Sequence, residues 1–308
     1  MKLIEPSVEY MHQDFGLDGM CEHIERCART CYKSEHNSKE GEAVNFVNKL
    51  VNSKHLSMLE HGTVYLQHSS SETDKIDDLY NRYSNNSYSK VHRTGGGGFS
   101  NSIWITTNYR VIVENMWNDD LKYFHEVPGR GDERYTLKFI TDIGIAREIL
   151  RHRKFSFANE STRYCNYSKD KFGNELVFIR PQHIPSAEKI QDGSIRDTDY
   201  ECAGLLQAAE VAYLDLIKAG WSPQEARCVL PLATKSELVV TGYKEDWDYF
   251  FALRLYESTG KVHPDMKYIA KLALEELESK TGYRYPREEV NLDEIDFGHD
   301  EETDRTDV

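Results

Sequence analysis

Apolar residues recur every three or four positions along several stretches of the chain, as they do on one face of an amphipathic helix. This spacing predicts helices over residues 17–32, 41–51, 143–152, 197–219, 245–257 and 264–280. Alternation of apolar and polar residues, or enrichment in β-branched and aromatic ones, predicts strands elsewhere. The predicted strands cover residues 62–68, 103–113, 134–141, 177–179 and 236–241. We therefore predict an α+β (α/β) fold in one domain, with a mainly antiparallel sheet flanked by helices.

Residues typical of helix ends support several of these boundaries. Thr141 or Asp142 can cap the helix 143–152, and Gly220 stands where the helix 197–219 should end. Ser222 followed by Pro223 is typical of an N-cap with proline in the first turn, so a further short helix should begin there.

The segments on either side of the second predicted strand are harder to interpret. Residues 69–90 are polar and rich in Ser, Asn and Asp, which predicts a loop, and residues 116–127 suggest a short helix. The four glycines at 95–98 are not followed by the Gly-Lys-Ser/Thr of a phosphate-binding loop. A turn is the simpler interpretation of that run.

Composition indicates a soluble globular protein. The 308 residues suffice for a large core, with 39% hydrophobic and 29% charged residues. No apolar run approaches membrane-spanning length, and the first residues lack the apolar core of a signal peptide. Six cysteines without a C-x-x-C pair predict reduced thiols and a cytoplasmic protein.

The acidic charge is concentrated at one end of the chain. Residues 288–308 hold ten acids and one arginine, which is −9 of the total net charge of −14. We predict a disordered acidic tail there, after a domain spanning 1–287. The charge argues against a nucleic-acid partner, but the nearly balanced body is compatible with a positive pocket.

The stretch 147–164 carries the most informative chemistry. It holds four arginines and His152, followed by short hydrogen-bonding side chains that suit a loop. Arginine forks match phosphate oxygens, so this stretch could hold a phosphorylated small molecule. Composition alone would favour the simpler interpretation, a solvated basic helix face.

Its spacing, however, resembles the signature of the flavin-dependent thymidylate synthases: Arg-His-Arg, seven residues, Ser and, two positions later, Arg. Here these are Arg151, His152, Arg153, Ser161 and Arg163. Two further segments resemble the same family. They are His55-Leu56-Ser57-Met58-Leu59-Glu60-His61 and Glu225-Ala226-Arg227-Cys228-Val229-Leu230-Pro231-Leu232, the latter followed by Arg254 twenty-seven residues after Arg227. The resemblance covers roughly 15–68 and 136–280, which leaves about 69–135 as a β-rich insertion.

The resemblance implies transfer of a methylene from methylenetetrahydrofolate to C5 of dUMP, with reduced FAD as hydride donor and NADPH as reductant of the flavin. The implied catalytic residues are Arg254, beside the uracil ring, and His55, near the flavin. The implied FAD-binding residues are Ser57, Glu60, Arg151, His152, Arg153, Asn159, Tyr243 and Tyr249. The implied substrate-binding residues are Glu148, Arg151, Glu160, Ser161, Thr162, Arg163, Arg227 and Arg254. No metal is expected, and family members are homotetramers whose sites combine residues of several subunits.

Four positions depart from the family or could mislead. Tyr243 and Glu245 replace an Asn-x-Arg pair that contacts the flavin, which leaves backbone groups or Lys244 as contacts there. Glu148 replaces the usual Gln, and an ionised carboxylate cannot donate a hydrogen bond. Cys165 lies close to the motif, but the family activates the pyrimidine without a cysteine, so we interpret Cys165 as structural.

Three alternatives stay open. A related flavin protein could modify dUMP differently, for instance by hydroxymethylation, and product analysis would separate the two. A non-catalytic nucleotide-binding protein could use the insertion and tail for interactions, although intact His55, Arg163 and Arg254 argue against it. RNA binding by 151–163 is the weakest, since the net charge is negative and no aromatic stacking platform is evident.

Overall fold

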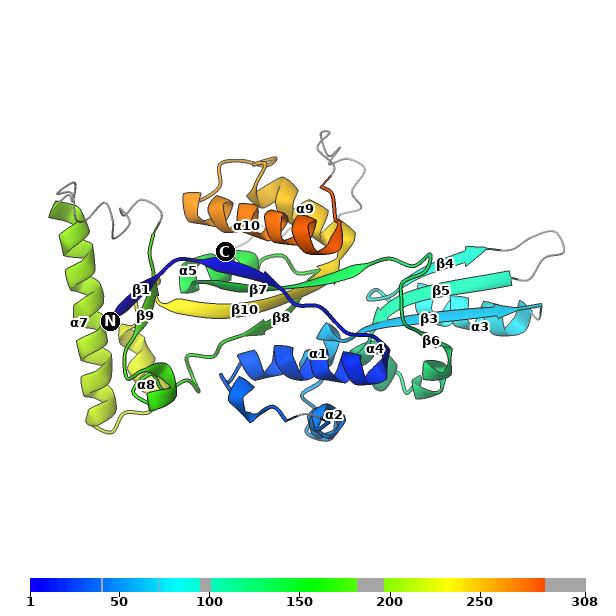
Figure 1. Cartoon of the computed structure of the whole chain (residues 1–308), viewed down its shortest axis with the longest axis horizontal. Coiled ribbons are helices and arrows are strands. Elements are labelled where there is room, and N and C mark those ends of the chain that lie inside the picture. Colours follow the sequence, from blue (N-terminus) through cyan, green and yellow to red (C-terminus); the bar gives the residue numbers. More distant parts are fainter. Residues whose placement is uncertain (40, 72, 95–100, 182–196, 286–308) are drawn as a thin grey trace, which may run out of the picture.

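The computed structural model describes residues 1–39, 41–71, 73–94, 101–181 and 197–285. They form helices and antiparallel sheets within one elongated chain, which confirms the predicted fold class (Figure 1). The predicted acidic tail and the four-glycine run lie outside these residues. Among the described helices, none is both long and apolar enough to cross a membrane.

A four-stranded antiparallel sheet with strand order β2-β7-β10-β8 forms the centre of the molecule. Its strands are β2 (Ser7–Tyr10), β7 (Arg134–Asp142), β10 (Lys235–Tyr243) and β8 (Ser156–Asn159). β10 pairs with β7 along its whole length and with β8 on its other side, where Leu238 lies opposite Asn159. The arginine-rich stretch is thereby placed next to the strand that leads to Arg254.

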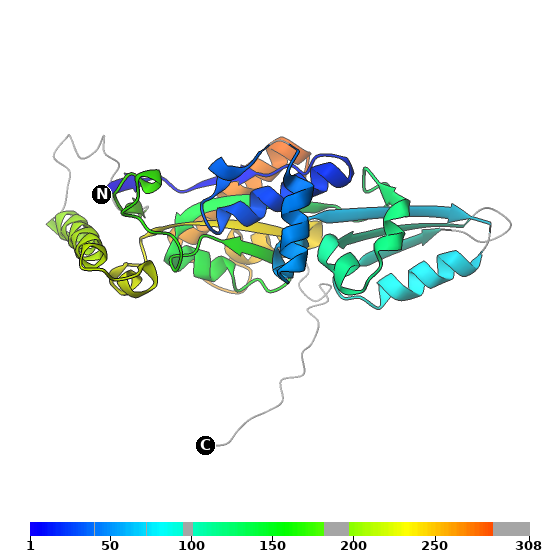
Figure 2. The same ribbon diagram turned by 90° about the horizontal axis from the view of Figure 1, so that it is seen from below.

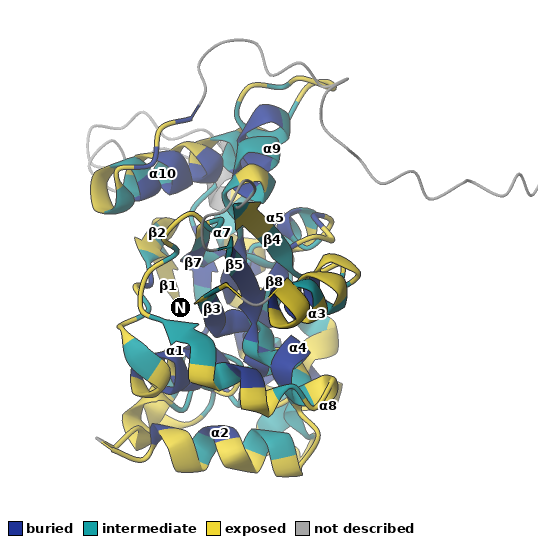
Figure 3. Cartoon of the chain, turned by 90° about the vertical axis from the view of Figure 1, so that its right-hand side faces the viewer, coloured by how far each residue is buried: buried dark blue, intermediate teal, exposed yellow. Residues whose placement is uncertain are grey.

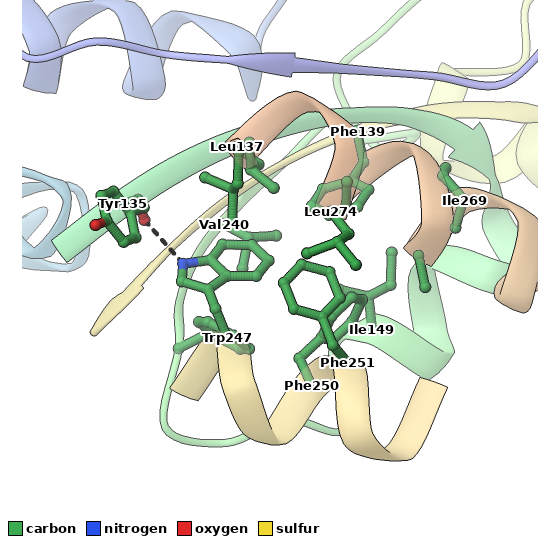
Figure 4. Packing of buried hydrophobic residues seen from close by; sticks show 14 of the residues in the cluster. Tyr135, Leu137, Phe139, Ile149, Val240, Trp247, Phe250, Phe251, Ile269 and Leu274 are labelled. Carbon is green, nitrogen blue, oxygen red and sulfur yellow. Dashed lines mark hydrogen bonds between the residues drawn. The ribbon is translucent and has the colours of Figure 1, made fainter. Parts of the chain in front are cut away.

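Three helices cover one face of this sheet: α5 (Ile143–Ile149), α9 (Lys244–Arg254) and α10 (Pro264–Thr281) (Figure 1). Their apolar sides close over the strands, and Trp247, Phe250 and Phe251 of α9 are fully buried (Figure 4). The Trp247 indole donates a hydrogen bond to the carbonyl of Tyr135 at 3.3 Å. Burial of three large aromatic side chains anchors the helix that ends at Arg254.

The opposite face of the sheet is covered by α1 (Gly16–Thr30) and the short 3-10 helix η2 (Leu56–His61), with α2 (Ala43–Asn52) outside them and largely exposed (Figure 3). Buried polar groups cross this layer in a chain. His61 Nδ1 and Thr136 Oγ1 each lie 2.8 Å from Thr241 Oγ1, and His23 Nε2 lies 3.1 Å from Thr136 Oγ1. Paired in this way, the buried hydroxyls and imidazoles avoid most of the cost of leaving water.

The insertion and the preceding strand β3 form a second antiparallel sheet beyond one end of the central one (Figure 2). Its strand order is β4-β5-β3-β6, formed by β4 (Lys90–Thr94), β5 (Asn101–Asn108), β3 (Thr63–Ser70) and β6 (Phe124–His125). Helices α3 (Thr73–Ser84) and α4 (Tyr109–Glu114) pack on it around a second core, which includes Ile76, Leu79 and Tyr83 and is shared with α1, α2 and η2.

A smaller layer lies at the other end. There β1 (Lys2–Ile4) pairs in parallel with β9 (Val177–Ile179), next to α7 (Asp197–Lys218), α8 (Pro223–Ala226) and η5 (Arg227–Val229). The predicted helix signals are confirmed: Ser222 and Glu225 form a capping box, and Gly220 has the positive φ of 94° expected after α7.

Several predicted elements were wrong. The predicted loop 69–90 contains α3, whose three buried side chains keep the helical period within a polar segment. The strand predicted for 103–113 ends at Asn108, because the Asn108 side chain accepts from the amide of Val111 and starts α4. The helix predicted for 116–127 is a 3-10 turn, η3 (Asn118–Tyr123), followed by β6. Similar 3-10 turns are Glu35–Asn37 and Asp170–Phe172.

One helix end was also misplaced. Helix α5 stops at Ile149 rather than residue 152, although Asp142 caps it as predicted, accepting from the amide of Ile145 at 2.8 Å.

Candidate functional site

Arg254 is held at the end of α9 by two residues from the arginine-rich stretch. Its Nε donates to His152 Nε2 at 2.9 Å, and its Nη1 lies 3.3 Å from Glu148 Oε2. Its Nη2 donates to the backbone carbonyl of Glu148 at 3.2 Å. The Arg254 side chain still exposes 21% of its surface. A guanidinium fixed on one side and open on the other can bind an anionic or carbonyl-bearing ligand.

His152 is neutral in this arrangement. Burial, and next the charge of Arg254, lower its pKa to about 4. Phe155, Tyr249 and Phe250 surround the ring with centroid distances of 5.0–6.1 Å. A neutral imidazole can accept at Nε2, and Arg254 Nε–H is the donor. His152 thus acts as an oriented acceptor that fixes the guanidinium.

Arg151 and Arg153 flank His152 and are both exposed. Within the described parts of the chain, neither forms an ion pair with an acidic side chain. Guanidinium groups without acidic partners are suited to phosphate oxygens. The donor chemistry at this edge therefore suits an anionic ligand that carries phosphate groups.

A cavity of about 500 Å³ lies beside α5, the helix that also carries Glu148 of the Arg254 cluster. It brings together four residues of the predicted substrate or cofactor set and adds Arg147. The four are Asn159, Glu160, Thr162 and Arg227. Arg147 and Arg227 are exposed, while Ile143 and Leu150 of the α5 region supply an apolar wall. Two arginines beside an apolar wall suit a phosphorylated ligand with a ring.

The neighbouring loop is held by local hydrogen bonds. The amide of Ser161 donates to the carbonyl of Cys31 at 3.0 Å, and Ser161 Oγ accepts from the amide of Arg163 at 3.3 Å. Arg163 Nε donates to Gln224 Oε1 at 3.1 Å, and Gln224 lines the cavity. Arg163 is therefore placed at the rim of the cavity, on the side of Thr162 and Arg227.

Glu160 belongs to a buried charge network that the sequence analysis missed. Its Oε2 lies 2.8 Å from Lys235 Nζ, which also lies 2.7 Å from Glu237 Oε1. Lys33 and Lys138 approach Glu237 at 2.6 and 2.7 Å. Burial opposes ionisation of Glu237, but the three lysines outweigh it and lower its pKa. Lys235 and Glu237 stand two residues apart on β10, and this spacing could have indicated two charged side chains on one sheet face.

His55, Ser57 and Glu60 lie together on η2, across the central sheet from the Arg254 cluster. His55 and Ser57 are exposed. Glu60 Oε1 accepts from Arg110 Nη1 of the insertion at 2.6 Å. Because η2 packs against β8 and β10 on the α1 side, this chain does not bring the three residues to Arg254.

Tyr243 and Glu245 are both engaged by the insertion. The Tyr243 hydroxyl lies 2.8 Å from the carbonyl of Thr106 and 3.0 Å from that of Tyr88. Glu245 Oε2 forms an ion pair with Lys90 Nζ at 2.6 Å. FAD binding by Tyr243 and by Tyr249, which lies against His152, stays a prediction.

Cys165 is buried, and burial followed by the Glu160 charge raises the pKa of its thiol to about 12. A thiol that stays protonated at neutral pH is not a nucleophile, in agreement with its predicted structural role. Within the described residues, no group of three or more His, Cys, Asp or Glu side chains could hold a metal ion.

Comparison with known proteins points to one family. A family model described as "Thymidylate synthase complementing protein" matches residues 132–281. A flavin-dependent thymidylate synthase of Synechocystis sp. is 28% identical over 140 residues, which are 44% of this chain and 63% of that protein. Those of Pyrococcus furiosus and Mycobacterium avium are 26% and 30% identical, over 59% and 43% of this chain and 70% and 52% of their own lengths. The chain thus spans less than two thirds of some of these relatives.

A solved structure, the UMP/dUMP methylase PolB from Streptomyces cacaoi bound with 5-Br dUMP, is also similar. It is 16% identical with a TM-score of 0.41, over 91% of this chain and 93% of that one. A similarity at this score informs neither fold nor function. Residues 132–281, just under half of this chain, thus match the thymidylate synthase complementing protein family, and the curated relatives named above are flavin-dependent thymidylate synthases.

Proposed function

We propose that this protein is a flavin-dependent thymidylate synthase that converts dUMP to dTMP. The one-carbon donor would be methylenetetrahydrofolate, and NADPH would reduce the flavin. The observation that carries the proposal is the Arg254 cluster, in which residues of two separate family motifs meet at hydrogen-bond distance. The family match over residues 132–281 supports the class of reaction.

The nucleotide phosphate would occupy the 500 Å³ cavity. Arg227 and Thr162 line it and Arg163 stands at its rim, which supplies charge-assisted and hydroxyl hydrogen bonds to a dianion. The loop that carries these residues would be fixed by two contacts: the Ser161 amide with the Cys31 carbonyl, and Glu160 with Lys235.

The pyrimidine would lie against Arg254. Attack by C5 on the one-carbon unit requires negative charge on the ring nitrogen and carbonyl oxygens. A guanidinium already fixed by His152 and Glu148 stabilises that charge without reorganising, which is the usual source of electrostatic catalysis. Glu148, as an ionised side chain, would act by orienting Arg254 and accepting a hydrogen bond from the ring.

Reduced FAD would supply the hydride that completes the methyl group. Arg151 and Arg153 are suited to its pyrophosphate, with His152, Asn159 and Tyr249 nearby. His55, Ser57 and Glu60 would contact the cofactor from η2. Since these three lie across the sheet from Arg254, we propose that the working enzyme is a homotetramer whose sites combine residues of different subunits. A cytoplasmic location stays a prediction from cysteine usage.

The absorption spectrum of the purified protein, followed by titration with dUMP, tests the proposal. We expect a flavin spectrum that shifts on adding dUMP. We also expect dTMP to form when methylenetetrahydrofolate and NADPH are supplied. A protein that binds no FAD would contradict it and favour a non-catalytic nucleotide-binding role. A product carrying a hydroxymethyl rather than a methyl group would favour the alternative modification of dUMP.

A further inference from the structure

The insertion contacts the rest of the chain at two segments of the candidate site. Helix α4 packs against η2, and the amide of Tyr109 donates to the carbonyl of Gly62 at 2.9 Å. The start of β4 and the middle of β5 meet the turn between β10 and α9. The insertion sheet thus bridges two segments that the family resemblance assigns to the flavin.

At the first contact, Arg110 holds Glu60. Arg110 Nη1 donates to Glu60 Oε1 at 2.6 Å, and Nη2 donates to Glu114 Oε1 of the same helix at 2.7 Å. The Glu60 side chain exposes 24% of its surface. Arg134, where the insertion ends, donates to the Glu60 carbonyl at 3.0 Å. Both the carboxylate and the backbone of Glu60 are therefore positioned by arginines at the insertion.

At the second contact, the two residues that depart from the family bind the insertion. Tyr243 reaches the carbonyls of Tyr88 and Thr106, and Glu245 pairs with Lys90. The Tyr243 ring also has Lys90 Nζ at 4.6 Å and the Arg134 guanidinium at 5.4 Å from its centroid. The Tyr243 hydroxyl can donate to the two carbonyls, and its ring attracts the two cations. The Glu245 carboxylate pairs with Lys90.

We propose that the insertion is a positioning element for the flavin site, in which Arg110 orients and neutralises Glu60, and that Tyr243 and Glu245 anchor the insertion. This inference rests on the proposed role of Glu60 in holding FAD. Arg110 is a positioning residue, because it would act through Glu60.

The electrostatics favour such a role over a purely stabilising one. A partly exposed ion pair contributes little to folding, about 0–1 kcal/mol. An unpaired Glu60 carboxylate would repel a cofactor that carries a pyrophosphate, whereas a paired one can still accept a hydrogen bond. Pairing with Arg110 keeps the acceptor and cancels most of the repulsion.

The test compares Arg110→Met with Arg93→Met in the full chain. Arg93 forms a similar ion pair, at 2.6 Å to Asp77, but wholly within the insertion. We expect Arg110→Met to raise the FAD dissociation constant, measured by flavin fluorescence, by about tenfold, as is common for charged groups in contact. Arg93→Met should leave it unchanged. In a Glu60→Gln background, Arg110→Met should have little further effect.

Equal weakening by both variants, no weakening by Arg110→Met, or a full effect in the Glu60→Gln background would overturn the inference. A wild-type protein that binds no FAD would instead contradict the proposed function. In that case the rate of amide hydrogen exchange over Leu56–His61, which needs no bound FAD, tests whether Arg110 positions this segment. Faster exchange there in Arg110→Met, but not in Arg93→Met, supports it, and unchanged exchange overturns it.

Discussion

At the scale of single residues, Arg254 carries the chemistry that can be tested most directly. Its three hydrogen bonds to His152 and Glu148 need the planar fork of arginine, which lysine lacks. We expect Arg254→Lys to reduce the rate of dTMP formation by roughly a hundredfold or more, the effect of removing one preorganised donor. Arg180→Lys, which alters a partly exposed pair with Glu5, is the matched control. Full turnover by Arg254→Lys would remove Arg254 from the catalytic set.

His61 makes stability depend on pH. Burial lowers its pKa to about 3, so the folded protein binds fewer protons than the unfolded chain, in which imidazole titrates near 6.5. The stability contribution is complete above pH 6.5 and is lost as the pH falls toward 3, by up to about 1.4 kcal/mol per pH unit. Urea unfolding at several pH values should show a shallower dependence for His61→Gln. If the free energy of unfolding changes with pH equally in the wild type and in His61→Gln, groups other than His61 determine the pH dependence.

At the scale of elements, strand β10 depends on a buried charge network. Glu237 is the common partner of Lys33, Lys138 and Lys235, which come from a loop, β7 and β10 itself. Glu237→Gln would leave three lysines without their shared carboxylate, and removing one member of a buried ion pair costs about 3–5 kcal/mol. Chemical denaturation should reveal this loss. A change below 1 kcal/mol would show that solvent reaches the network.

The elements also show how far the sequence could predict the structure. Strands β7 and β10 and helices α9 and α10 were predictable because apolar, β-branched and aromatic residues recur in them at strand or helix spacing. Helix α3 was missed because only Ile76, Leu79 and Tyr83 interrupt a polar segment. The Arg254 cluster followed from motif spacing, whereas Arg110 and the Lys235–Glu237 network depend on contacts between distant segments. No local pattern specifies such contacts.

At the scale of the whole molecule, the candidate residues form separate groups. Arg254 with Glu148 and His152 is one group, and Thr162 with Arg227 around the cavity is another. The η2 residues lie across the central sheet. If sites form between subunits, a chain that lacks one group can be complemented by a chain that lacks another. A monomeric enzyme could not show this behaviour.

We therefore expect activity when two inactive variants, Arg254→Ala and Arg227→Ala, are combined by co-expression. If each site takes Arg254 from one subunit and Arg227 from another, random assembly leaves about a quarter of the sites intact in a symmetric oligomer. The turnover of the mixture, compared with each variant alone, measures this fraction. A mixture that stays inactive would show that both arginines serve a site within one subunit. One subunit would then hold both groups, because α5 supplies Ala146 and Arg147 to the cavity and Glu148 to the Arg254 cluster.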